Sequence, residues 1–426
     1  MARQLLALAC AGLLLPLAFA ADEAGKVKAL VAKLGAEKEA DRNAAEAELL
    51  KLGDAALPHL PSTENKDLNA EQKTRLGKVL PKIWQARVER DLAGSFVEIP
   101  KGAMPLADAL KEIERQTGNV VRDQRDEFNE EATNPTIQFD GKKRKFWEAM
   151  DLLCKDAGVS MEHFAGENAV GIRGRPGDVL GAGSITVGAM RFAPQNITLT
   201  RVVGQPTAKC VVNIQAMFEP RLRPLLVEVD VDSFKVLDDR GQEIKFSSER
   251  QQSTYNFSVQ EGAHTFEIAL DLEAPERAAK AIKSISGEAA LRLPAITEQF
   301  TFDKWTGDEM QEKATPSMKV KVGKAKDEMD GLWSFQMAVA MLGEKPEGES
   351  YLAAGLSPEI YLVNQDGSRL APNAGTNVRE DEGQAVFEYL ISGAPGKLSD
   401  YKVVVRIPSG VTRAPVKFEL KDLQLP

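Results

Sequence analysis

From residue 185 to its end, the chain alternates apolar and polar residues with a period of two. Stretches such as ITLTRVV, KCVVNIQAMF and HTFEIALDL place every second side chain on one face, which is the pattern of half-buried β-strands. Residues typical of turns separate these stretches at regular intervals. The pattern predicts two Ig-like antiparallel β-sandwiches, over residues 185–302 and 318–426, with a polar linker over residues 303–317.

One short pattern occurs in both predicted sandwiches. VLDDRGQEI at residues 236–244 aligns with LVNQDGSRL at residues 362–370, and Gly241 and Gly367 stand at the same place in the two segments. Both segments fit a hairpin turn flanked by apolar residues. An internal duplication explains the likeness, and so does turn chemistry alone.

Residues 1–20 have the pattern of a secretory signal peptide. A positive start at Arg3 precedes an apolar run, and Ala18-Phe19-Ala20 forms a small-x-small cleavage site. We therefore expect cleavage after Ala20 and an exported chain, periplasmic or extracellular. Cys10 raises the alternative of a lipoprotein, but it lies early in the apolar run and the residues before it match a lipidation site poorly. No later segment is long and apolar enough to predict a transmembrane helix.

The chain carries 54 Lys and Arg against 63 Asp and Glu, a formal net charge of −9. This sign disfavours nucleic acid as a partner, because the phosphate backbone is also negative. Cys154 and Cys210 fall on a predicted helix and a predicted strand, which favours two separate buried cysteines over a disulfide. Stability is therefore expected to come from several hydrophobic cores.

Residues 22–93 have the apolar spacing of helices, from Val27, Leu30, Val31 and Leu34 onward. Part of this segment resembles a HEAT-type helical repeat. A single repeat cannot bury its own apolar face, so we expect it to pack on the next helix or on another domain. The residues that match the repeat are Arg42, Ala44, Ala45, Leu49, Leu52, Gly53, Ala56, Pro58 and Leu60.

Residues 95–173 predict a small domain with the order β-α-β-β-α-β-β. Pro105 suits the first position of a helix and Gly118 suits its end. The apolar residues of both helices repeat at helical spacing, so we expect the two helices to cover one face of one small sheet. A Gly- and Pro-rich linker is expected over residues 174–184.

This order resembles the short amino-terminal domain shared by secretins and TonB-dependent receptors. The resemblance implies a domain that works by protein–protein contact and has no chemistry of its own. The pore-forming or receptor barrel of those families has no counterpart in this sequence, so the resemblance does not extend to a channel or to uptake. The residues that carry it are Leu106, Ala109, Leu110, Ile113, Thr117, Gly118, Ala149, Met150, Asp151, Leu152 and Leu153.

Lys142, Lys143, Arg144 and Lys145 stand just before the second predicted helix of this domain. Positive charges at a helix N-terminus oppose the helix dipole, so they bring no local stabilisation. They are therefore a candidate site for an anionic polymer, an acidic protein surface or lipid head groups. A solvated basic loop is the alternative interpretation.

No catalytic, cofactor-binding or metal-ligating residue is predicted. The three histidines fall in different predicted domains and lack ligands at metal-binding spacing. Five acids near the end of one strand lack the spacing of a calcium loop, and the strand acids are expected to face water. The residues in question are His59, His163 and His264, and Glu228, Asp230, Asp232, Asp238 and Asp239.

The sequence thus predicts a multidomain α+β protein that is exported and is not an enzyme. The first hypothesis is a protein–protein interaction or envelope-assembly protein, whose partners are envelope proteins. The alternative is a protein that binds carbohydrate or another envelope polymer, through a sandwich face or through the basic run. A hydrolase whose site is assembled from distant residues stands as a third hypothesis.

Overall fold

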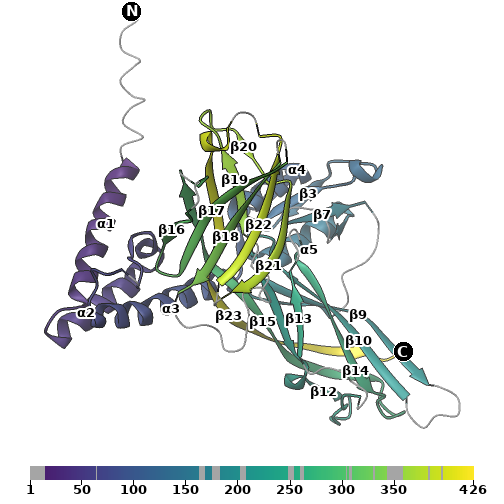
Figure 1. Ribbon diagram of the computed structural model, residues 1–426. Helices are drawn as coiled ribbons and strands as arrows, with labels where there is room; N and C mark the ends of the chain where they lie inside the picture. The colour runs from purple at the N-terminus through teal and green to yellow at the C-terminus, as the bar shows by residue number, and fades with distance from the viewer. Residues whose placement is uncertain are drawn as a thin grey trace, which may run out of the picture. The chain divides into compact units, whose positions relative to one another are not determined.

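The computed structural model describes residues 15–63, 65–162, 168–174, 183–201, 208–247, 254–259, 263–303, 305–306, 309–329, 332–342, 358–381, 384–394 and 397–426. The fold is mixed α+β, with about a quarter of its residues in helices and nearly half in mostly antiparallel strands (Figure 1). Internal contacts divide the chain into unit 1, Met1–Arg87 with Pro294–Thr412, and unit 2, Val88–Leu293 with Arg413–Pro426. Within the described ranges, no helix has both the length and the apolar character that crossing a membrane requires.

One apolar core holds the helical part of unit 1 together. Leu34, Leu49 and Leu76 are completely buried in it, and Ile296 from a later strand packs against it. Most of the stability of a helix in a protein comes from packing of its apolar face, so the shared core stabilises these helices. The elements are α1 (Leu15–Lys33), α2 (Glu39–Leu52), the 3₁₀ helix η1 (Gly53–His59) and α3 (Ala70–Leu92).

Residues 95–173, in unit 2, follow the predicted order of elements, with β2 and β5 as additional short strands. The expectation of one sheet is wrong, because the strands form three small sheets, β1-β5, β2-β4 and β3-β7-β6. Pro100 and Pro135 adjoin these short strands, and their missing N–H groups limit pairing there. The elements are β1 (Phe96–Val97), β2 (Gly102–Pro105), α4 (Leu106–Thr117), β3 (Val120–Asp123), β4 (Thr136–Phe139), β5 (Arg144–Lys145), α5 (Phe146–Ala157), β6 (Ser160–Glu162) and β7 (Ala169–Arg173).

Glu219 connects this α/β part to the strands that follow it in unit 2. The completely buried carboxylate accepts hydrogen bonds from Ser95 N (2.8 Å), Ser95 Oγ (2.7 Å), Asn119 Nδ2 (3.1 Å) and Arg221 Nε (2.6 Å). A charge is tolerated in the interior only when it is paired and hydrogen-bonded. These four bonds therefore define how Ser95 and Asn119 sit against the end of strand β10 (Ala208–Phe218).

Unit 2 also contains a first set of strands in two sandwich-like sheets. One sheet has the order β14-β10-β9-β8; in the other, β13, β11 and β15 are neighbours and β12 pairs with β15. All these pairings are antiparallel. The strands are β8 (Ile185–Val187), β9 (Met190–Arg201), β10 (Ala208–Phe218), β11 (Leu226–Asp230), β12 (Lys235–Asp238), β13 (Thr254–Ser258), β14 (Thr265–Glu273) and β15 (Ala281–Phe302).

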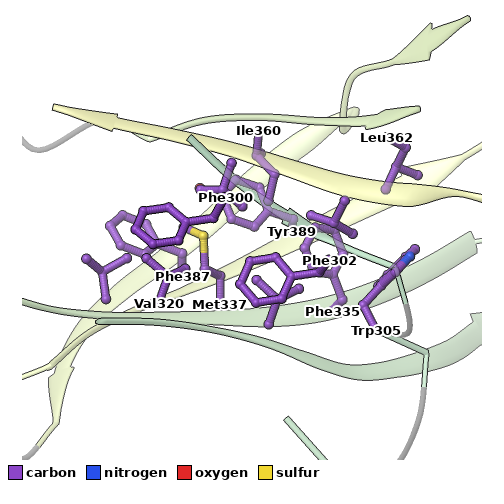
Figure 2. Close-up of a cluster of buried hydrophobic side chains, with 14 of the residues drawn as sticks. Phe300, Phe302, Trp305, Val320, Phe335, Met337, Ile360, Leu362, Phe387 and Tyr389 are labelled. Carbon is purple, nitrogen blue, oxygen red and sulfur yellow. The ribbon is translucent and has the colours of Figure 1, made fainter. Parts of the chain in front are cut away.

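Unit 1 contains a second set of strands around an aromatic core. Phe335 and Tyr389 are stacked in it at 5.4 Å between ring centroids, and Trp305 meets Phe335 edge-on (Figure 2). One sheet has the order β16-β17-β18-β22-β21, and β23, β19 and β20 are neighbours in the other. The strands are β16 (Gln311–Ala314), β17 (Met318–Met329), β18 (Leu332–Met341), β19 (Glu359–Val363), β20 (Arg369–Leu370), β21 (Ala374–Asp381), β22 (Gln384–Ser392) and β23 (Lys402–Gln424).

The two sets of strands share part of their order. Sheet β8-β9-β10-β14 corresponds strand for strand to β16-β17-β18-β22, and β12 pairs with β15 as β19 pairs with β23. The turns after β12 and β19 contain the same two backbone hydrogen bonds, and Gly241 and Gly367 in them have φ angles of 78° and 86°. Agreement over four strands of one sheet and one strand pair of the other favours an internal duplication over turn chemistry alone.

Strands β15 and β23 belong to both units. Residues 281–293 of β15 lie in unit 2 and residues 294–302 lie in unit 1, whereas β23 contributes residues 402–412 to unit 1 and 413–424 to unit 2. The first half of β15 therefore belongs to the strands of unit 2, and its second half belongs to those of unit 1. The first half of β23 belongs to unit 1 and its second half to unit 2.

Aromatic side chains anchor both exchanged halves. Phe300 and Phe302 of β15 are buried in the aromatic core of unit 1 (Figure 2). Phe418 of β23 stacks on Phe192 in unit 2 with 3.9 Å between ring centroids, and it meets Phe234 edge-on. Burial of such rings is the largest apolar contribution that a single residue makes to a core.

Replacing Phe418 tests whether the end of β23 stabilises unit 2. We expect Phe418→Ala to lower the free energy of unfolding by about 3–5 kcal/mol, the usual effect of truncating a buried phenylalanine. Hydrogen exchange should speed up in β9 and β15 residues of unit 2 before it does in β18 and β22. Lys417→Ala, at the exposed neighbouring position, is the control. Equal stability of the two variants would contradict this role.

Candidate functional site

A cavity of about 570 Å³ lies in unit 1, between η1, the end of β15 and the segment that follows β16. This volume is within the range of pockets that hold small ligands. Half of its lining residues are apolar, three of them prolines, and the other half are polar or charged. The apolar residues are Leu57, Pro58, Leu60, Pro61, Ile296, Ala314 and Pro316.

One wall of the cavity is the edge of a strand. Four consecutive β15 residues, 296–299, line it, and because side chains alternate between the faces of a strand, the cavity must run along the backbone edge. Along the edge of β15 that pairs with β11, the pairing ends at Arg292, which lies opposite Leu226. Within the described ranges, the end of β15 therefore has β23 as a strand neighbour on one edge and no strand on the other.

The edge strand β16 lies beside this edge of β15. Lys313 Nζ on β16 donates a hydrogen bond to the Thr301 carbonyl on β15. Ala314 at the end of β16, with Thr315 just after it, also lines the cavity. The cavity thus lies where two sheets of unit 1 both present an edge.

Glu298 holds a negative charge in the cavity wall. Thr315 Oγ1 donates to Glu298 Oε2, and Ser317 Oγ donates to Oε1. Ser409 Oγ lies 3.1 Å from Oε1 and 2.6 Å from Ser317 Oγ. Because hydroxyls from two other segments contact both carboxylate oxygens, the charge is held in one place.

Asp54 and Arg87 form an ion pair on the helical side of the cavity, with Nη1 to Oδ2 at 3.5 Å. Both side chains are about one-third exposed, so the pair contributes little to stability. The lining residues thus include two carboxylates, those of Asp54 and Glu298, and one guanidinium, that of Arg87. The cavity is net negative.

The chemistry of these groups suits binding. Ser317 and Ser409 are almost completely buried, so their hydroxyls position Glu298 and are not placed to attack a substrate. The apolar walls and the fixed carboxylate instead offer a shaped, charged surface to an occupant that is apolar with a positive group.

Sequence reasoning did not find this cavity. Ser317 and Ser409 lie 19 and 111 residues from Glu298 along the chain, so no local motif joins them. The segment predicted as a linker, residues 303–317, contains strand β16 and supplies two of the hydroxyls. Only the fold brings these residues together.

The predicted basic run lies at β5 and the start of α5. Arg144 makes two hydrogen bonds with Asp140, at 2.6 and 2.7 Å, and its guanidinium lowers the pKa of Asp140 below the usual value. Lys142 Nζ is 3.4 Å from the same carboxylate, whereas Lys143 Nζ lies 4.5 Å from the ring centroid of the exposed Phe96. Lys145 directly precedes α5, and its backbone N–H donates to Glu148 Oε2. The run is therefore partly neutralised and has an aromatic ring under it.

The histidines do not converge on a site. His59 is partly exposed, His264 is completely buried, and His163 lies outside the described residues. In the part of the chain that the structure describes, no group of three or more His, Cys, Asp or Glu is placed to hold a metal ion.

The acids of β11 and the residues after it differ in their surroundings. Asp230 and Asp232 are exposed, as predicted. The expectation that Glu228 faces water is wrong, because its side chain is only 12% exposed. It pairs with Arg292 at 2.5 Å and with Arg413 at 2.9 Å inside unit 2. Arginines from β15, its neighbour in the sheet, and from β23, the next strand beyond it, thus cover Glu228.

Two comparisons with known proteins found no relative. No protein-family model matches the chain. No curated protein matches it either.

The two described cysteines predict a pH dependence. Both are free and buried, as predicted, and burial raises the pKa of Cys154 to about 12 and that of Cys210 to about 11. The unfolded thiols ionise near their ordinary pKa while the folded thiols stay neutral. Their contribution to the free energy of unfolding is therefore complete below about pH 8.5 and falls as pH rises toward the folded pKa values.

Urea unfolding at several pH values between about pH 8 and pH 11 measures this loss. The variant with both Cys154→Ala and Cys210→Ala should lose less stability over that range than the unsubstituted protein. The same slope in both proteins would show that the thiols are not the cause.

Proposed function

We propose that the chain is an exported, non-catalytic interaction protein of the cell envelope, which binds part of a partner protein in the cavity of unit 1. In this proposal the HEAT-like helical segment, residues 22–93, and the end of β15 form the binding site. The small secretin/TonB-type domain, residues 95–173, and the two Ig-like sandwiches provide further contact surfaces and spacing. The signal peptide is removed after Ala20, and the mature protein acts in the periplasm or outside the cell.

The observation that carries the proposal is a strand edge beside a cavity that has both apolar and polar lining residues. A strand edge presents backbone N–H and C=O groups that a segment of another chain can pair with. The Glu298 carboxylate and the Asp54–Arg87 pair add polar groups at set positions. Sites with apolar walls and a few fixed polar groups are typical of recognition.

Site-specific photo-crosslinking in the native envelope tests the proposal. A photoreactive residue at the exposed Thr297 should capture one specific protein, identified by mass spectrometry. The same residue at Thr74, exposed on α3, is the matched control and should not capture it. Ala314→Trp, which narrows the cavity, should abolish the capture. A capture that is the same from both positions, or that survives Ala314→Trp, would contradict the proposal.

A second candidate function is binding of an anionic envelope polymer by the basic run. Lys143 over the exposed ring of Phe96 favours it, because a cation beside an aromatic face suits a sulfated or carboxylated sugar chain. Lys142, with a side chain 77% exposed, adds a second accessible charge.

Dextran sulfate is a suitable probe for this candidate. Lys142→Gln with Lys143→Gln should weaken its binding roughly fivefold, since two exposed charge contacts of roughly 0.5 kcal/mol each are lost. Lys28→Gln with Lys33→Gln, at two exposed positions of α1, is the control for net charge. An equal loss in both double variants would mean that only overall charge matters.

A further inference from the structure

The edge of β15 limits what the cavity can receive. Residues 296–299 line it, and four strand residues extend over roughly 13 Å. Alternating N–H and C=O groups along such an edge are matched by another extended peptide backbone, which repeats at the same spacing. Sugars and lipid head groups lack that repeat. The edge therefore selects a protein segment in extended conformation.

The charge of the lining selects the side chains of that segment. Asp54 and Glu298 are negative, and Arg87 is the positive residue among those that line the cavity. Because Thr315, Ser317 and Ser409 hold Glu298 in place, an incoming cation meets a fixed carboxylate at little reorganisation cost. The apolar walls, Leu57 and Ile296 among them, suit the residues on either side of that cation.

We infer that the cavity binds an extended segment of a partner protein that carries a lysine or arginine between apolar residues, and that this segment adds as a strand to residues 296–299 of β15. The inference rests on the proposed function and names the kind of partner segment. The backbone pairing gives the orientation of the segment. Glu298 and Asp54 give the preference for a positive side chain.

Three capped heptapeptide libraries test the charge preference on the full-length protein. They carry Lys, Gln or Glu at the centre, with alternating Val and Thr elsewhere, and fluorescence anisotropy measures their binding. The Lys library should bind at least about tenfold more tightly than the Glu library. Glu298→Gln and Asp54→Asn should each reduce this preference severalfold. Glu359→Gln, at an exposed position of β19, is the matched control and should leave it unchanged.

N-methylation of the bound peptide tests strand addition. In a strand pair, the amides of every second residue donate to the neighbouring strand. Methylating one alternate set of amides should therefore abolish binding, and methylating the other set should leave it within about threefold. Equal tolerance of both sets would overturn strand addition.

The remaining outcomes separate this inference from the proposed function. A preference for the Glu library, or none, would overturn the cationic segment, even if Thr297 still captures a partner protein. Capture of another part of this chain, or of a second copy, from position 297 would overturn the partner segment. Thermal unfolding of Glu298→Gln and Asp54→Asn shows whether each is folded. If Glu298→Gln does not fold, the peptide binding of Asp54→Asn decides whether the charge preference exists.

Discussion

Two long strands, β15 and β23, determine how this chain is built. Each leaves the unit that it begins in and ends in the other. The core of unit 1 includes Phe300 and Phe302 of β15, and unit 2 includes the Phe192–Phe418 stack from β23. Neither set of strands is therefore complete by itself, although the two sets share part of their strand order. A duplication followed by exchange of the last half-strand accounts for both facts.

The cavity depends on the change of unit within β15. Beyond Arg292, β15 leaves its pairing with β11 and continues into unit 1. Its second half keeps one strand neighbour, so one edge faces the cavity beside η1 and β16. Unpaired edges are usually covered or charged in natural proteins. Here the helical segment around η1 covers the edge of β15 but leaves the cavity between them. Glu298 provides a charge at this edge.

Local pattern was enough to predict many of the elements, but it missed the short strands β2, β5 and β16. The helix predicted to begin at Pro105 and end at Gly118 is α4, and alternation located the strands from residue 185 onward. Alternation does not say which sheet a strand joins, so the change of unit within β15 could not be predicted. The Glu298 cluster joins residues up to 111 positions apart, and Glu228 is covered by arginines of two other strands. Both depend on strand pairing that single-sequence spacing does not encode.

The exchanged half-strands also decide what proteolysis can do. A protease that cuts the backbone between β15 and β23 would leave two fragments, each holding part of the other's interior. Separating them would expose Phe300 and Phe302 on one fragment and Phe418 on the other, all of which are buried in the intact protein. Burial of these three rings therefore opposes the separation of the two fragments after a cut.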